Sequence, residues 1–204
     1  MTSLPARIVA VADRSRGPAT PRGGTRGAIV FRKQLIVFAG AVAAFPVIFL
    51  VWRHAAQLFA RVTLPADDAA SRLAYAAHWL ILPGLTLLAG IVCAGRRGFI
   101  ADAIDGTRTP ANHGLEINLR YKLNTLEQTV LVAIAWGAMA PLLPRDELQL
   151  IPAMAFLFAF GRIAFWIGYL VHPLGRAFGM VLTAAPTLAA YVWLVSHAWH
   201  SQVP

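Results

Sequence analysis

Three polar residues are spaced by about one helical turn each, next to a long apolar segment. The segment from Leu115 to Gln128 reads LEINLRYKLNTLEQ and contains Arg120, Asn124 and Glu127. Positions i, i+4 and i+7 return to nearly the same angle in an α-helix, so the three side chains are predicted to share one face. Ionisable groups are costly in hydrocarbon and usually face a bundle interior or a wet cavity. The pattern indicates a functional site, with a helix-locking polar network as the alternative.

A second polar pattern lies in the segment GRIAFWIGY, which starts at Gly161 and ends at Tyr169. Arg162 and Tyr169 are seven residues apart and are predicted to share a helix face. A guanidinium this deep in an apolar segment needs an acceptor, and we expect an interhelical ion pair with Glu127. The small residues Gly161 and Gly168 are typical of helices that approach each other closely.

The composition indicates an all-α integral membrane protein. Hydrophobic residues make up 58% of the chain and charged residues only 13%, far from a typical soluble domain. A transmembrane helix needs about 20 predominantly apolar residues. Five segments approach that length: Gln34–Trp52, Leu73–Gly95, Leu123–Leu143, Leu148–Val171 and Ala177–Ser196.

The distribution of basic residues predicts the membrane orientation. The net charge is +9, but the basic residues follow the loops between apolar segments and do not cluster on a soluble module, so we expect no nucleic-acid partner. Most of them lie in the first 33 positions and in the connection after Gly95. The positive-inside rule then predicts a cytoplasmic N-terminus and a C-terminus outside.

The remaining features set the domain organisation. Residues 1–33 are rich in Arg, Gly, Pro, Ser and Thr, so we expect a disordered basic cytoplasmic tail. Residues 34–52 are expected to form one transmembrane helix and residues 73–196 a four-helix transmembrane domain. The six histidines form no metal-ligand pattern, so no metal site is predicted.

The polar residues predicted to meet at the cytoplasmic end suit a small zwitterionic ligand with more than one carboxylate. Arginine pairs with carboxylates in a bidentate manner, glutamate accepts an ammonium group, and asparagine can donate or accept. An arginine can also lower the pKa of a ligand thiol by stabilising the thiolate. Glutathione fits this description. The set comprises Arg96, Arg97, Arg120, Asn124, Glu127, Tyr169 and Arg176.

These motifs resemble those of the membrane-associated proteins in eicosanoid and glutathione metabolism (the MAPEG family). The resemblance rests on Arg120-x-x-x-Asn124-x-x-Glu127, the segment from Gly161 to Tyr169, and Arg176 seven residues later. Together with Arg96-Arg97 it is most similar to the leukotriene synthase branch, with the divergence of a bacterial relative. It covers residues 73–196, roughly three-fifths of the chain.

The resemblance implies a four-helix subunit in a homotrimer, with glutathione between adjacent subunits near the cytoplasmic face. Arg176 would stabilise the thiolate and Arg97 would be a second catalytic group. The acceptor would be a lipophilic small molecule from the bilayer. The glutathione-binding residues it implies are Arg96, Arg120, Asn124, Glu127 and Tyr169.

Three departures from the family pattern are visible. The family has four spans, so the helix at residues 34–52 is additional. Phe165 stands where the family often has a polar ring, and Gln128 follows Glu127 where an aromatic residue is usual. The changes at Phe165 and Gln128 affect the expected glutathione affinity more than the expected fold.

Three functions are compatible with these observations. The first is a glutathione-dependent transferase or peroxidase of the bacterial inner (plasma) membrane that acts on lipophilic electrophiles or hydroperoxides. The second is a non-enzymatic MAPEG-like protein that binds a lipid or a partner protein. A transporter or channel is disfavoured because the chain lacks a duplicated half and paired broken helices.

Overall fold

The computed structural model describes residues 23–101, 103–105 and 112–202, and in these ranges helices are the only regular secondary structure. The predicted all-α integral membrane fold is confirmed. The elements in chain order are α1 (Gly23–Arg53), α2 (Ala55–Leu58), α3 (Ala69–Trp79), α4 (Ile81–Gly95), the 3₁₀ helix η1 (Arg96–Phe99), α5 (His113–Met139), the 3₁₀ helix η2 (Arg145–Glu147), α6 (Leu150–Val171) and α7 (Ala177–Gln202).

The chain divides into two compact units, residues 1–35 and residues 36–204. In the first unit, the described residues 23–35 are the first part of α1. The predicted tail over residues 1–33 therefore overlaps the start of α1 from residue 23, while residues 1–22 lie outside the described part of the chain. Residues 28–35 contain neither proline nor glycine, and five of them are alanine, leucine, arginine, lysine and glutamine, which have high helix propensity.

The second unit contains the rest of α1 and all later helices. Four helical segments are long and apolar enough to cross a membrane: Gly27–Arg53, Ala69–Phe99, Arg145–Val171 and Ala177–His200. The predicted span Leu123–Leu143 is not among them, so the prediction of five apolar spans is wrong in this respect. The physical reason is that five charged or amide side chains lie in α5 between positions 120 and 128: Arg120, Lys122, Asn124, Glu127 and Gln128.

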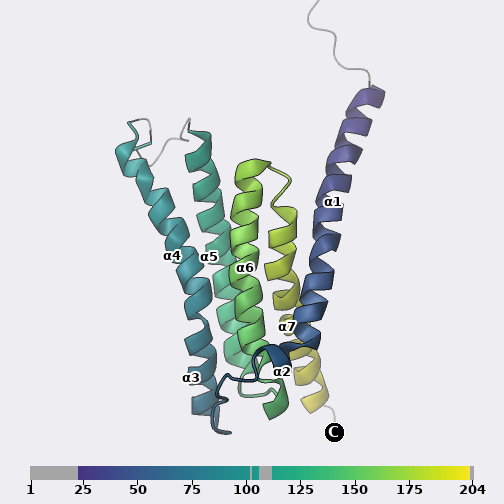
Figure 1. Ribbon diagram of the computed structural model, residues 1–204, viewed down its shortest axis with the longest axis vertical. Coiled ribbons are helices and arrows are strands. Elements are labelled where there is room, and N and C mark those ends of the chain that lie inside the picture. Colours follow the sequence, from purple (N-terminus) through teal and green to yellow (C-terminus); the bar gives the residue numbers. More distant parts are fainter. Residues whose placement is uncertain (1–22, 102, 106–111, 203–204) are drawn as a thin grey trace, which may run out of the picture. The chain divides into compact units, whose positions relative to one another are not determined.

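α5 nevertheless packs beside the spans. In Figure 1, α4 and α6 run in one direction and α5 and α7 in the other, and α5 packs against α4, α6 and α7. The predicted span Leu73–Gly95 is divided into α3 and α4 at Leu80. Pro83 explains the break, because proline lacks an amide donor and its ring crowds the carbonyl of Trp79 four residues earlier.

Glycines let α6 and α7 approach closely, as the sequence predicted. A Cβ atom at Gly161 would lie 2.8 Å from Cγ2 of Thr183, and one at Gly168 would collide with the carbonyl of Gly175. A Cβ atom at Gly179 would collide with the backbone of Phe165 and Gly161. Small residues on both helices therefore bring the two backbones into contact, which is how membrane helices gain packing contacts.

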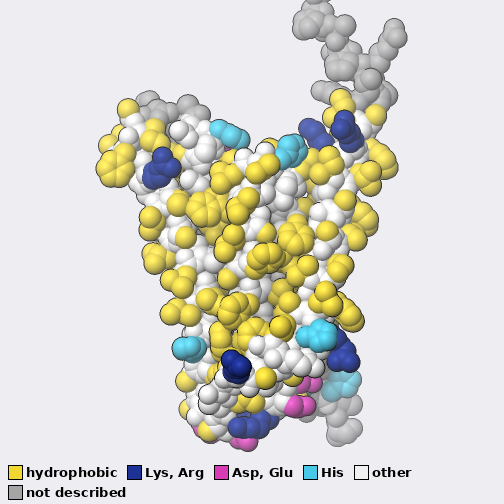
Figure 2. Space-filling view, viewed as in Figure 1, with side chains coloured by type: hydrophobic (Ala, Val, Ile, Leu, Met, Phe, Trp, Pro, Cys, Tyr) yellow, Lys and Arg dark blue, Asp and Glu magenta, His cyan; other side chains and the backbone are white. Residues whose placement is uncertain are grey.

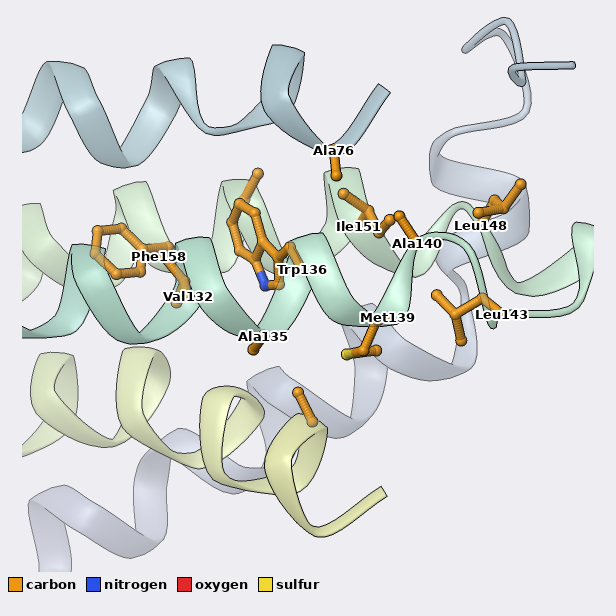
Figure 3. Close-up of a cluster of buried hydrophobic side chains, with 12 residues drawn as sticks. Ala76, Val132, Ala135, Trp136, Met139, Ala140, Leu143, Leu148, Ile151 and Phe158 are labelled. Carbon is orange, nitrogen blue, oxygen red and sulfur yellow. The ribbon is translucent and has the colours of Figure 1, made fainter. Parts of the chain in front are cut away.

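The main core surrounds α5. Figure 3 shows side chains from α3, α5 and α6 converging, with Trp136 and Val132 from α5 near Phe158 and Ile151 from α6. Trp136 and Phe158 are each 1% exposed, so this part of the bundle is buried as completely as the core of a soluble protein.

The outer surface of the bundle is apolar. Large hydrophobic side chains such as Leu88, Val92, Ile134 and Ile163 are about half exposed or more. On the face shown in Figure 2, apolar side chains cover the middle of the bundle, and acidic side chains gather at its lower end. Soluble monomers rarely expose so much contiguous apolar surface, so this surface is suited to contact lipid.

A polar clasp holds the lower end of the bundle in Figure 1. Asp67 accepts hydrogen bonds from Nη1 of Arg145 at 2.7 Å and from Nη2 of Arg72 at 3.0 Å. Arg72 also donates to the carbonyl of Leu143 at 2.6 Å, and Arg145 donates to that of Pro65 at 3.0 Å. The clasp ties the segment before α3 to the connection between α5 and α6.

Candidate functional site

Tyr169 lies between two arginines at the upper end of the bundle. Nη1 of Arg120, on α5, donates to the phenol oxygen of Tyr169, on α6, at 3.2 Å. The guanidinium carbon of Arg176, just before α7, lies 5.0 Å from the centroid of the same ring. Arg120 is exposed and also pairs with Glu116 at 2.6 Å, whereas the Tyr169 side chain is buried. The three predicted site residues Arg120, Tyr169 and Arg176 therefore meet.

Asn124 belongs to a buried network around Arg162. Nη1 of Arg162 donates to Oδ1 of Asn124 at 2.7 Å, and Nη2 donates to Oγ1 of Thr183 at 2.5 Å. The guanidinium carbon also lies 4.7 Å from the ring centroid of Phe165. The Arg162 side chain is 0% exposed. An amide, a hydroxyl group and aromatic rings therefore surround this cation.

The predicted ion pair between Arg162 and Glu127 is wrong. Glu127 is exposed on α5, and none of the described contacts of Arg162 involves it. Residues 124 and 127 are three apart, so Glu127 lies about 60° further round the helix than Asn124. That rotation turns the Glu127 carboxylate away from α6 and toward the surface of the bundle.

Arg96 lines an open pocket between α4, α5 and α6. The pocket has a volume of about 240 Å³, and its lining includes Cys93, Arg96, Asn112, Asn118 and Trp166. Nε1 of Trp166 donates to Oδ1 of Asn118 at 2.9 Å. The Asn118 amide nitrogen is therefore the group that remains to donate to a ligand, beside the Arg96 cation.

The side chain of Arg97 contacts the loop that follows η1. Its Nε donates to the carbonyl of Ala103 at 3.1 Å, and its Nη2 is 3.5 Å from the carbonyl of Asp105. Both acceptors are backbone oxygens of the segment after η1. The structure thus gives Arg97 a role in fixing this loop, and it does not bring Arg97 to Tyr169.

Sequence reasoning missed the polar stripe on the buried face of α5. Asn118, Tyr121, Thr125 and Gln128 are all at most 9% exposed. The Tyr121 hydroxyl donates to the carbonyl of Thr86 at 3.2 Å, and its ring stacks on Trp166 with centroids 4.8 Å apart. Their spacing of three to four residues is visible in the sequence and indicates one helix face, as the spacing of Arg120 and Asn124 does.

The candidate residues form two groups on different sides of α5. Asn118 and Arg120 are two positions apart, which places their side chains about 200° apart around the helix. The pocket beside Arg96 and Asn118 therefore opens on one side of α5, and the Arg120–Tyr169–Arg176 group lies on the other. A ligand bound on one side of α5 would therefore contact only one of the two groups.

The chain is similar to two curated membrane proteins. It is 29% identical over 163 residues to Transmembrane protein 79 of Mus musculus, which covers 79% of this chain and 41% of that protein. The identity to Transmembrane protein 79 of Bos taurus is 28% over 162 residues, with the same coverage. The chain thus spans about two fifths of the length of these relatives. No protein-family model and no solved structure matches it. The chain is therefore a membrane protein with distant homology to Transmembrane protein 79 over most of its length.

Proposed function

We propose that this chain is a MAPEG-like, glutathione-dependent transferase or peroxidase of the bacterial inner membrane. The observation that supports it best is the placement of two exposed guanidinium groups, Arg120 and Arg176, around the Tyr169 phenol. In this proposal the N-terminus faces the cytoplasm, as the positive-inside rule predicts.

The residues would divide the chemistry as follows. Arg120 and the Asn124 amide would hold the carboxylates of glutathione through charge-assisted hydrogen bonds. Arg176 would stabilise the thiolate, because a cation nearby favours the ionised thiol. Tyr169 would keep the two guanidinium groups at a fixed separation. Its hydroxyl could also donate to the sulfur while accepting from Arg120.

The reaction would join the glutathione sulfur to a lipophilic electrophile. The thiolate would form a carbon–sulfur bond as a leaving group departs with its electron pair. With a hydroperoxide, the thiolate would take the terminal oxygen and release an alcohol. A second glutathione would then complete the disulfide and release water, so two thiols are oxidised and one peroxide is reduced.

Assembly of several copies, with a homotrimer as the expected form, would complete the site. Arg120 and Glu127 are exposed on α5 beside apolar side chains such as Leu123 and Val130. Ionised groups beside a lipid-facing surface are costly unless another polar surface covers them. A neighbouring copy would supply that cover, and its Arg96 could approach the Arg120 group of the first copy.

A direct test is glutathione binding to the purified protein in detergent. We expect saturable binding at millimolar glutathione and an increase in thiolate absorbance in the ultraviolet. S-methylglutathione, which has no thiol, should bind without that signal. Arg176→Ala should remove the thiolate signal and leave the oligomer intact, whereas the control Arg61→Ala, at the opposite end, should behave as the wild type. An absence of binding at millimolar glutathione would remove this proposal.

A non-enzymatic role is the second candidate, and one observation favours it. Arg120 already pairs with Glu116, and Asn124 already accepts from Arg162, so both groups have partners without a ligand. In that case the network would stabilise the helix packing of a protein that binds a lipid or a partner protein. Failure of glutathione to bind, together with loss of stability in Arg120→Ala, would support this alternative.

A further inference from the structure

The end of the bundle opposite Tyr169 contains a pair of adjoining pockets. One is apolar and has a volume of about 70 Å³. The other is polar and has a volume of about 200 Å³. Trp52, Glu147 and Leu150 line both pockets, so the two spaces adjoin at these residues. An apolar compartment beside a polar one is the arrangement that an amphiphile requires.

The apolar pocket lies between α1, α5, α6 and α7. Its walls include Ile48, Val51, Met139, Leu157 and Pro186. A cavity needs about 10–15 Å³ to hold one water molecule, so this space can take several methylene-sized groups. A space lined by hydrocarbon gains little from water and favours an acyl chain.

The polar pocket contains one cation and two carboxylates. Arg53 comes from the end of α1, and Asp146 and Glu147 come from η2. None of the three forms an ion pair with another residue in the described ranges of the chain. Their charges are therefore available to a ligand that carries both signs.

Gln149 adds a requirement for a hydrogen-bond donor. It lines the polar pocket, and its Oε1 atom is buried without a partner among the described residues. A buried acceptor without a donor costs free energy, so a ligand that donates there is favoured. An ammonium group has three donors and matches this acceptor together with the two carboxylates. A quaternary choline group has none.

We propose that this pair of pockets binds a phospholipid with a primary-amine headgroup, of the phosphatidylethanolamine type. The phosphate pairs with Arg53, the ammonium group lies among Asp146, Glu147 and Oε1 of Gln149, and one acyl chain enters the apolar pocket. An anionic headgroup without an amine would place its charge against two carboxylates, which is unfavourable.

The additional helix α1 gains a function from this proposal. It contributes Ile48, Val51 and Trp52 to the apolar pocket and Arg53 to the polar one. It is held on the bundle through Ala44, which is 0% exposed and packs in one cluster with Leu157 and Leu182. Without α1, both pockets would lose one wall.

Native mass spectrometry of the full chain, delipidated in detergent, tests the proposal with defined lipids. We expect phosphatidylethanolamine to be retained about fivefold or more in preference to phosphatidylglycerol and phosphatidylcholine. Arg53→Gln should weaken retention of all three lipids. Asp146→Asn combined with Glu147→Gln should remove the preference for the amine. Arg61→Gln, an exposed arginine that lines neither pocket, is the matched control.

A second measurement locates the acyl chain. Phosphatidylethanolamine with a photoreactive group at the chain end should crosslink to residues such as Met154, Leu157 and Pro186. Ala189→Phe, which fills the apolar pocket, should reduce this crosslinking, while Ala138→Phe on the exposed face of α5 should not. Equal retention of the three lipids, unchanged retention in Arg53→Gln, or crosslinks elsewhere on the surface would each overturn the proposal. Arg53, Asp146 and Glu147 are exposed, so the substitutions at these three positions retain the fold.

Discussion

Arg162 on α6 donates a hydrogen bond of 2.7 Å from Nη1 to Oδ1 of Asn124 on α5, and this bond determines what Asn124 can offer a ligand. Because the amide oxygen is occupied, the amide nitrogen is the group left free. From the sequence, Asn124 could donate or accept. In the structure the amide oxygen already accepts from Arg162, so a ligand group bound beside the amide nitrogen would be an acceptor such as a carboxylate or a carbonyl.

Replacing Arg162 with methionine should destabilise the bundle. The substitution leaves Oδ1 of Asn124 without its donor in the interior, which costs about 1–3 kcal/mol of unfolding free energy. The measurement is the unfolding transition in mixed detergent micelles with increasing denaturing detergent. Arg61→Met, which changes an exposed arginine, should leave the transition unchanged. Equal transitions for Arg162→Met and the wild type would show that the network does not stabilise the bundle.

Asn124→Asp separates the structural role of this residue from its proposed binding role. A carboxylate can still accept from Arg162, so we expect the unfolding transition to be retained or raised. The amide donors are lost, and glutathione affinity should fall about tenfold, as expected for one hydrogen bond to a charged group. Calorimetric titration with glutathione measures the second effect. Unchanged affinity in a folded variant would remove Asn124 from the site.

Arg97→Ala should affect the loop after η1 and not the Tyr169 group. Arg97 donates to the carbonyl of Ala103, so its removal should increase the rate of amide hydrogen exchange in residues 100, 101 and 103–105. Glutathione affinity should stay within about twofold of the wild type. A loss of affinity as large as that of Arg176→Ala would instead assign Arg97 to the site.

Gly179→Ala should disrupt the contact between α6 and α7. A methyl group there would collide with the backbone of Phe165 and Gly161, and such overpacking costs about 1–3 kcal/mol. Gly137→Ala is the matched control, since a Cβ atom at Gly137 has nothing within 4 Å. It should be neutral or slightly stabilising because alanine has the higher helix propensity. Thermal unfolding compares the two, and equal melting temperatures would contradict the close approach.

Protonation of Asp67 at acid pH should weaken the clasp and lower the stability of the fold. Hydrogen bonds from Arg145 and then Arg72 hold the pKa of Asp67 below its ordinary value of 3.8. A carboxyl group whose folded pKa is lowered stabilises the fold above its unfolded pKa, and this contribution is lost as the pH falls through the folded pKa. Melting temperature should therefore fall more steeply below pH 3.8 in the wild type than in Asp67→Asn. Parallel curves would contradict the clasp, and Arg145→Gln should flatten the curve in the same way.

The sequence by itself determined the class of the protein and most of its helices. Apolar segments of about 20 residues have no stable alternative to a helix in lipid, because every backbone polar group must find a partner within the segment. The predicted ranges Leu148–Val171 and Ala177–Ser196 therefore agree closely with α6 (Leu150–Val171) and α7 (Ala177–Gln202). The glycines at 161 and 168 likewise indicated the close approach of these two helices.

Tertiary structure decided which polar side chains meet. Helical spacing places Arg120, Asn124 and Glu127 within one arc, but that arc lies at the border of the buried face of α5. Small differences in angle there decide whether a side chain meets α6 or the surface, so Asn124 reaches Arg162 while Glu127 does not.

The packing of α1 against α6 and α7 depends on contacts between residues more than one hundred positions apart, which no local pattern encodes. The pockets at that end of the bundle could therefore be found only in the folded chain.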